Sequence, residues 1–168
     1  MNPWLIFILA VIVINFLLNS TISLLNLKAL SPDLPEEFND IYDRGKYRQS
    51  QDYTRVQTIF SLFENSIITA ITVLFLLGGG FNLFDQFVRG FNLGSITTGI
   101  IYTGLITLLS FLVGLPFSIY STFKIEARFG FNRTTARTFI TDILKSILLS
   151  ILLGAPILAA ILWFFENT

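Results

Sequence analysis

The sequence predicts an all-α integral membrane protein with four transmembrane helices, a cytoplasmic helical loop and a short interfacial helix. Of the 168 residues, 53% are hydrophobic and only 13% are charged, whereas a soluble domain carries about 25% charged residues. Several uncharged apolar stretches are long enough to cross the hydrocarbon core, which takes about 20 residues in a helix. The basic residues also gather in alternate connecting segments. Together these observations predict a multi-pass helical membrane protein.

We interpret residues 1–168 as a single transmembrane module with spans at about residues 4–27, 56–77, 96–123 and 138–165. No Lys or Arg precedes the first span, and its apolar run is too long for a signal peptide, so we expect an uncleaved helix. Four polar residues of this helix share one face. They favour hydrogen bonds to a neighbouring helix, and a wetted surface facing a cavity is the alternative. These residues are Asn15, Asn19, Ser23 and Asn26.

A hydrophilic segment at residues 28–55 leads to the second span, and from about Lys46 we expect one helix that runs unbroken into it. Glu64 lies nine residues past Arg55, about two and a half helical turns. A charged side chain costs roughly 2.5 to 3.5 kcal/mol at the bilayer centre on insertion scales. Glu64 is therefore expected to face protein or water, either in a polar pathway or in a pair with a neighbouring helix.

The triplet Gly78-Gly79-Gly80 is expected to end the second helix. Aromatic residues then recur at helical spacing, with Asp85 and Arg89 on the opposite side. This pattern predicts a short amphipathic helix that lies in the plane of the membrane interface. Its apolar side consists of Phe84, Phe87, Val88 and Phe91.

Small and polar residues line one face of the third span for about six turns. They are Gly99, Thr103, Thr107, Ser110, Gly114, Ser118 and Ser121. Pro116 is expected to kink this helix near its end, and Pro156 to kink the fourth. The fourth span repeats small residues at every fourth position, which favours close approach of another helix. These small residues are Ser146, Ser150 and Gly154.

The orientation follows from the basic residues of the connecting segments. The first and third segments hold ten of the eleven, and the second holds only Arg89. Cytoplasmic loops carry the excess of Lys and Arg, so both basic loops are predicted to be cytoplasmic and both termini non-cytoplasmic. The ten residues are Lys28, Arg44, Lys46, Arg48, Arg55, Lys124, Arg128, Arg133, Arg137 and Lys145.

The chain contains no histidine and no cysteine. It therefore lacks the commonest metal ligand and the commonest general base at neutral pH, and no thiolate chemistry is available to it. A zinc hydrolase of the H-E-x-x-H type cannot be built from these residues alone. We assign no catalytic residue and no metal ligand. The net charge is zero, so nucleic acid is not an expected partner.

The most specific stretch runs from Leu115 to Thr135. Gly130 can adopt a backbone conformation closed to other residues, which allows two aromatic rings to flank a sharp turn. Asn132 and the threonines after it offer side-chain caps to the following helix. We call the turn residues the signature loop: Glu126, Arg128, Phe129, Gly130, Phe131 and Asn132.

The segment LPFSIYSTFKIEARFGFN closely resembles the loop between the third and fourth membrane helices of type I CAAX prenyl proteases. The segment IYDRGKYRQSQDYTRVQTIF, residues 41–60, resembles the stretch that leads into the second membrane helix of that family. These proteases are integral-membrane zinc metallopeptidases that cleave prenylated C-terminal tails. The signature loop matches the family loop but contains no zinc ligand or catalytic base of the family.

The resemblance implies an N-terminal module that forms part of the wall of an intramembrane substrate chamber, in the cell inner membrane or the endoplasmic reticulum membrane. Zinc, a C-terminal metallopeptidase domain and a prenylated or other peptide substrate are expected only for a longer protein, of which this chain would be a fragment. A non-enzymatic scaffold or partner subunit is the alternative, and a transporter or channel is less favoured because no inverted repeat is evident. The candidate chamber-lining residues are Glu64, Asn65, Thr69, Thr103, Thr107 and Ser110.

Overall fold

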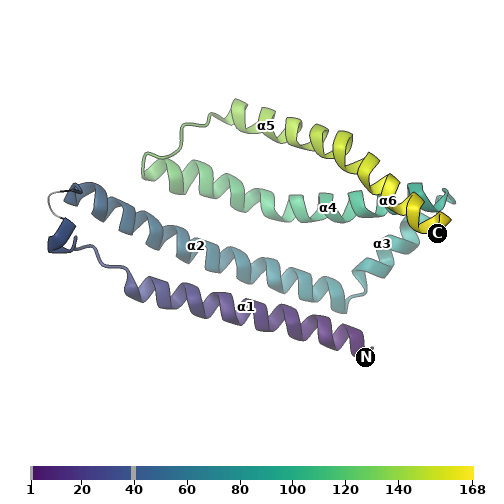
Figure 1. Cartoon of the computed structure of the whole chain (residues 1–168), viewed down its shortest axis with the longest axis horizontal. Coiled ribbons are helices and arrows are strands. Elements are labelled where there is room, and N and C mark those ends of the chain that lie inside the picture. Colours follow the sequence, from purple (N-terminus) through teal and green to yellow (C-terminus); the bar gives the residue numbers. More distant parts are fainter. Residues whose placement is uncertain (1, 39–40) are drawn as a thin grey trace. The chain divides into compact units, whose positions relative to one another are not determined.

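A computed structural model describes residues 2–38 and 41–168 of the chain, and these residues form helices and the loops that join them (Figure 1). Four helical runs within them are long and apolar enough to cross a membrane. The prediction of an all-α membrane protein is confirmed. The runs cover Pro3–Ala29, Arg44–Leu77, Ser95–Glu126 and Ala136–Asn167. The chain forms two compact units, Met1–Gly78 with Pro116–Asn132, and Gly79–Leu115 with Arg133–Thr168.

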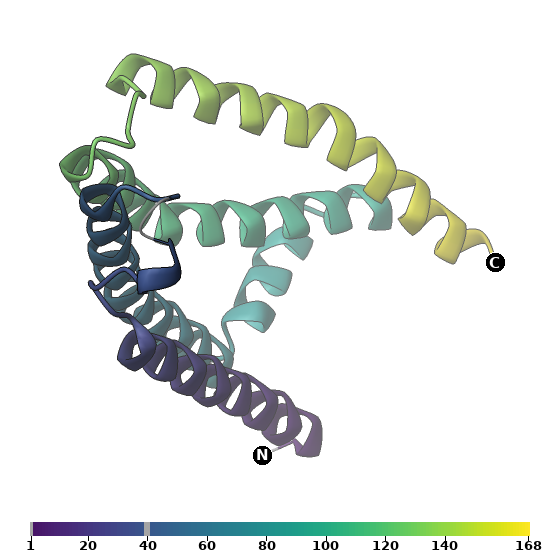
Figure 2. The ribbon, with the colours of Figure 1, turned by 60° about the vertical axis from the view of Figure 1, so that its left-hand side comes forward.

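In the first unit, α1 (Pro3–Ala29) packs along α2 (Arg44–Leu77), and the two helices run in opposite directions (Figures 1 and 2). A short 3₁₀ turn, η1, occupies Glu36–Phe38 between them. Half-buried residues of α1 recur every three or four positions, so one stripe of α1 faces α2. This stripe includes Leu5, Leu9, Ile12, Phe16, Ser23 and Leu27.

Asparagines of α1 bond within their own helix. The Asn19 Nδ2 donates to the Asn15 carbonyl oxygen at 2.8 Å and to the Asn15 Oδ1 at 2.9 Å. Both side chains are exposed, whereas Ser23 is half-buried. Within the part of the chain that the structure describes, the expected hydrogen bonds from these asparagines to a neighbouring helix are therefore replaced by bonds one turn along α1.

Helix α2 begins at Arg44, slightly before the expected start, because the Asp43 side chain caps it by accepting from the Lys46 backbone N–H at 2.8 Å. Its 34 residues correspond to about 51 Å, whereas the hydrocarbon core is about 30 Å thick. All its charged residues except Glu64 lie between Arg44 and Arg55. This first third of α2 is therefore a helical extension beyond the hydrocarbon core, and we call it the α2 extension (residues 44–55).

The second unit contains α3 (Gly80–Arg89), most of α4 (Ser95–Tyr120), α5 (Ala136–Leu149) and α6 (Ala155–Asn167). The α3 helix follows Gly79, whose φ of 69° is in the left-handed region. Its Val88 is fully buried, and the Arg89 Nε lies 2.8 Å from the Asp85 Oδ2. The hydrogen bond and charge of Asp85 raise the pKa of Arg89 above its ordinary value. The two-sided character expected of this helix is present.

Both proline-containing runs include a segment of π-helix. In the third run, η2 (Ser121–Glu126) begins five residues after Pro116, whereas in the fourth, η3 (Ser150–Gly154) includes Leu152, four residues before Pro156. Proline lacks the N–H that bonds the carbonyl oxygen four residues earlier. A π turn changes the hydrogen-bonding register locally and keeps the helix continuous. The fourth run therefore extends without interruption from α5 into α6 (Figure 2).

Helices α4 and α6 meet through small and polar side chains. The Ser95 hydroxyl donates to the Glu166 carboxylate, and one turn further along α4, Gly99 faces Leu162. A Cβ atom at Gly99 would lie 2.6 Å from the Leu162 Cδ1. Ser146, Ser150 and Gly154 are exposed instead. In the second unit the Leu162 side chain thus reaches Gly99, whereas the repeat of small residues in the fourth span is exposed.

We expect Gly99→Val to destabilise the protein, because the new side chain would overlap Leu162. Overpacking of this kind costs about 1 to 3 kcal/mol. Thermal unfolding in detergent measures the effect. Gly104→Val is the matched control, since nothing lies within 4 Å of a Cβ atom at that position. Equal midpoints for the two variants would show that Leu162 moves aside without cost.

Candidate functional site

The signature loop is seated on one face of α2. The Gln49 Nε2 donates to the Phe129 carbonyl oxygen at 2.9 Å, and the Gln57 amide lies 3.5 Å from the Ser121 hydroxyl. Gln49, Tyr53 and Gln57 are four residues apart, so they form a single stripe on the helix. Gln49 contacts Phe129 and the later Gln57 contacts the earlier Ser121, so α2 and the segment at residues 117–131 run antiparallel.

Aromatic rings make most of this contact. The Tyr53 ring packs edge-on against Phe129 and Phe131, with centroid distances of 5.4 and 4.8 Å. Seven residues further along α2, the Phe60 ring stacks on the Tyr120 ring with 5.1 Å between their centroids. The centroid of the Phe117 ring lies 6.2 Å from that of Phe60. Each such pair contributes about 0.5 to 1.5 kcal/mol beyond the burial of its area. We call the pairing of Tyr53 and Gln49 with Phe129 and Phe131 the loop clamp.

The loop itself is a Schellman motif that ends the third helical run. The Phe131 N–H donates to the Glu126 carbonyl oxygen at 2.9 Å, and the Gly130 N–H to the Ala127 carbonyl oxygen at 3.2 Å. Gly130 has a φ of 76°, in the left-handed region. This is the hydrogen-bond pattern with which a left-handed glycine satisfies the last carbonyl groups of a helix. The predicted turn at Gly130, flanked by two aromatic rings, is therefore present.

The charged members of the loop contribute differently from its backbone. Among the described residues, Glu126 and Arg128 make no ion pair, and the Arg128 guanidinium lies 5.5 Å from the centre of the Phe129 ring. The Glu126 carbonyl oxygen accepts from both Phe131 and Asn132. The backbone and the aromatic rings, and not paired charges, thus determine the shape of this loop.

The six candidate chamber-lining residues belong to different units. Glu64 and Thr69 are half-buried and Asn65 is exposed in the first unit, whereas Thr103, Thr107 and Ser110 are exposed in the second. The hydroxyls of Thr107 and Ser110 donate to carbonyl oxygens one turn earlier, at 2.8 and 3.0 Å. These two donors are therefore satisfied without a partner helix and leave lone pairs available on the exposed face.

The residues present do not fit a zinc site. The sequence contains no histidine or cysteine, and no group of three or more Asp or Glu side chains able to hold a metal occurs in residues 2–38 and 41–168. Zinc in hydrolases is bound mainly by imidazole. We derive no chemical step through a metal for this chain.

Sequence reasoning missed the partners of the signature loop. The sequence alone assigned no partner to Tyr53 or to Gln49. Their spacing of four, shared with Gln57, was the available signal. That spacing marks a face of α2 but does not say which segment packs on it.

Four long apolar helices, joined partly by a structured polar loop, define a multi-pass helical membrane protein. A family described as "CAAX prenyl protease N-terminal, five membrane helices" matches residues 23–168. The chain belongs to this family and corresponds to the N-terminal membrane part of its members. The described residues contain four candidate spans, against the five of the family description.

Individual relatives support the same assignment. CAAX prenyl protease 1 of Saccharomyces cerevisiae is 30% identical over 98% of this chain and 39% of its own length. CAAX prenyl protease 1 homolog of Oryza sativa subsp. japonica is 30% identical over 98% of this chain and 41% of its own. The crystal structure of S. mikatae Ste24p has a TM-score of 0.89 at 29% identity and covers 99% of this chain and 40% of that one. This chain thus spans about two fifths of the length of these relatives.

We expect Gly130→Val to open the signature loop at a cost of about 1 to 2 kcal/mol, because a side chain disfavours the left-handed conformation. A Cβ atom there would meet nothing within 4 Å, so the cost is conformational and not steric crowding. Gly130→Asn, which tolerates this conformation better, is the matched control. Hydrogen exchange of the Phe131 and Asn132 amides measures the opening. The expectation fails if valine and asparagine give equal protection.

Proposed function

We propose that this chain forms part of the wall of an intramembrane substrate chamber in a prenyl protease-like zinc metalloendopeptidase, with the signature loop at the chamber's cytoplasmic rim. The observation that carries the proposal is the polarity of α2. One side of α2 packs on α1 and another on residues 117–131. The two remaining sides differ sharply in polarity, as the two sides of a wall between lipid and water would.

The first remaining side of α2 is apolar and exposed. It presents Ile59, Leu74 and Leu77, with exposed fractions of 53 to 68%. The opposite side is polar, and Glu64 lies on it at a depth where contact with lipid is costly. Its polar members are Ser61, Glu64, Asn65 and Thr72.

The asparagines of α1 extend the polar side. Asn15, Asn19 and Asn26 lie about a quarter turn from the stripe of α1 that faces α2, at 100° per residue. Because the two helices are antiparallel, that quarter turn points to the same side as the polar residues of α2. The first unit therefore has one polar side and one apolar side, which supports a wetted interior next to a lipid-facing exterior.

The chemistry of the proposed enzyme has to come from other residues. We propose that a metallopeptidase domain C-terminal to this module in the same protein supplies an H-E-x-x-H motif and the zinc. The relatives are named CAAX prenyl proteases, so a prenylated peptide is the proposed substrate. This chain would bind and orient that peptide through the polar side of α2 and would exclude lipid.

The test is made in the protease that contains this module, with Tyr53→Ala, which removes the ring that packs on the signature loop, and Gly130→Val. Both are expected to lower cleavage of a prenylated peptide about fivefold or more, which corresponds to roughly 1 kcal/mol, while the zinc content stays normal. Arg89→Gln, in α3 and outside the signature loop, is the control. Unchanged cleavage in both variants would contradict a role at the rim.

A non-enzymatic scaffold is the second candidate, because the chain itself offers no zinc ligands. The isolated chain is expected to bind no zinc tightly and to have no peptidase activity. Zinc analysis of a chelator-washed sample and a peptide cleavage assay measure this. The scaffold would be favoured if the longest form of the protein assembles normally but has no protease activity.

We also propose that the first and third loops are cytoplasmic and both termini non-cytoplasmic, in the inner membrane or the endoplasmic reticulum membrane. The ten-to-one distribution of basic residues supports this orientation. In intact cells, cysteines introduced at Ser50 and Asn132 are expected to resist an impermeant reagent from outside, whereas one at Asn92 reacts. Labelling of Asn132 from outside would reverse the orientation.

A further inference from the structure

The fourth helical run is longer than a bilayer requires. Its 32 residues correspond to about 48 Å, against a hydrocarbon core of about 30 Å. Residues 146–165 carry no charge and by themselves match that thickness. The first ten residues, 136–145, therefore extend beyond the core, into the headgroup region and the water next to it. We call them the α5 extension.

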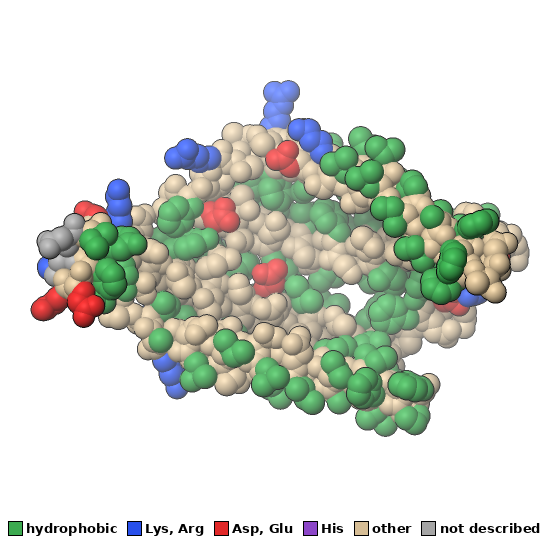
Figure 3. Space-filling view, viewed as in Figure 1, with side chains coloured by type: hydrophobic (Ala, Val, Ile, Leu, Met, Phe, Trp, Pro, Cys, Tyr) green, Lys and Arg blue, Asp and Glu red, His purple; other side chains and the backbone are tan. Residues whose placement is uncertain are grey.

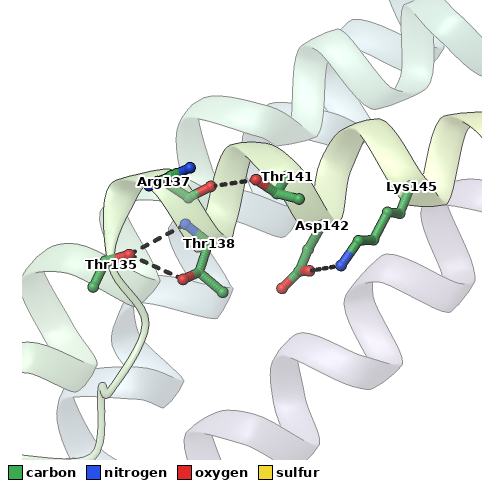
Figure 4. Close-up of polar contacts among 6 residues, drawn as sticks. All are labelled: Thr135, Arg137, Thr138, Thr141, Asp142 and Lys145. Atoms are coloured by element: carbon green, nitrogen blue, oxygen red, sulfur yellow. Dashed lines mark hydrogen bonds and ion pairs between the residues drawn. The ribbon is translucent and has the colours of Figure 1, made fainter.

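The α5 extension is well formed. The Thr135 hydroxyl accepts from the Thr138 backbone N–H at 3.2 Å, as expected of a capping threonine in this loop (Figure 4). The Thr141 hydroxyl donates to the Arg137 carbonyl oxygen at 2.8 Å (Figure 4). These bonds hold the extension as a regular helix, so its side chains keep fixed angular positions.

Basic side chains dominate the charged residues of the extension and of the short segment before it. Arg133, Arg137 and Lys145 are opposed by a single acid, Asp142, and basic side chains stand out over α5 in Figure 3. Lys145 lies 3.8 Å from Asp142, with both side chains more than 60% exposed (Figure 4). Arg133 and Arg137 make no ion pair within the described part of the chain. Two exposed guanidinium groups thus carry uncompensated charge.

Arg137 continues an exposed apolar face of α5. Four apolar residues lead from the uncharged part of the run towards its N-terminal end, with exposed fractions of 57 to 64%: Ile151, Leu148, Leu144 and Ile140. They recur at spacings of three and four, and Arg137 is the next position on this stripe. Exposed apolar side chains of a membrane helix face lipid tails, so a basic residue directly above them meets the lipid headgroups. Bulk water is reached only further out.

We propose that Arg133 and Arg137 form an interaction surface for the headgroups of anionic phospholipids, which anchors the α5 extension to the membrane surface. Guanidinium groups bind phosphate and carboxylate oxygens with several N–H donors at once, and phosphatidylserine offers both. Basic residues beside an anionic leaflet gain about 1 kcal/mol each. The surface depends only on the membrane-spanning fold, and it does not require protease activity.

The test uses the full 168-residue chain in bilayer nanodiscs that contain spin-labelled phosphatidylserine or phosphatidylcholine. Electron paramagnetic resonance measures the preference of each lipid for the protein surface. In Arg133→Gln/Arg137→Gln the preference for phosphatidylserine is expected to fall about fivefold per arginine at low salt. Arg133→Lys/Arg137→Lys should keep most of it, because the charge remains. Arg89→Gln, which removes a basic residue paired with Asp85, is the control and should keep all of it.

The proposal is overturned if the glutamine pair keeps its preference, if the lysine pair loses as much, or if Arg89→Gln has the same effect. Inorganic phosphate, added at constant ionic strength, should not displace phosphatidylserine, and displacement would indicate a site for a free anion instead. If the Arg133→Gln/Arg137→Gln variant does not fold in phosphatidylcholine nanodiscs, the lipid preference of the unsubstituted chain is measured at increasing salt concentration instead. The preference must then fall with added salt, and a preference that is insensitive to salt overturns the proposal.

Discussion

The absence of water from the bilayer core is the constraint on which this structure depends. A backbone N–H or C=O group that is exposed to lipid has no partner outside its own helix, so the chain crosses as continuous helices. The two proline-containing runs stay helical throughout, and each includes a π turn, at Ser121–Glu126 and at Ser150–Gly154. Irregular backbone is confined to segments near the ends of the spans, and at Gly130 a Schellman motif satisfies the last carbonyl groups of the helix.

The same constraint explains why aromatic and small residues make the helix contacts. Lipid tails are as apolar as leucine, so burial from water does not drive helices together inside the bilayer. Shape and ring geometry take over this role, as in the stacking of Phe60 on Tyr120 and the seating of Leu162 against Gly99. The loop clamp lies at the α2 extension, where Gln49 adds a hydrogen bond to the contacts of Tyr53.

The two extensions have different partners. The α2 extension is covered on one face by the signature loop, with both rings of the loop on Tyr53. The α5 extension has exposed apolar residues that lead directly to Arg137. A covered face is consistent with a structural role at a rim, and an exposed basic face with contact to the membrane surface. Helix length beyond the hydrocarbon core thus creates both surfaces.

The sequence by itself determined the all-α class, the four apolar runs, the turn at Gly130 and the capping threonine of α5. These features depend on the length of an apolar stretch, the backbone freedom of glycine and short-range hydrogen bonds. Each of these properties is determined by neighbouring residues in the sequence. It also supported the family, through two segments matched in order. Lys145, within the expected fourth span, is one residue outside the uncharged stretch, so local composition also marks where the membrane part of that helix begins.

Only the tertiary structure decided which segments meet. Tyr53 and Phe131 are far apart in the sequence, and nothing near Tyr53 indicates the ring on which it packs. The repeat of Ser146, Ser150 and Gly154 is exposed in the second unit, whereas the contact at Gly99 depends on Leu162 of the facing helix, which no pattern around Gly99 indicates. The residue type of Glu126 does not indicate its contribution to the turn, which is made by its backbone carbonyl oxygen. Contacts between distant residues depend on the arrangement of whole helices, which no local pattern encodes.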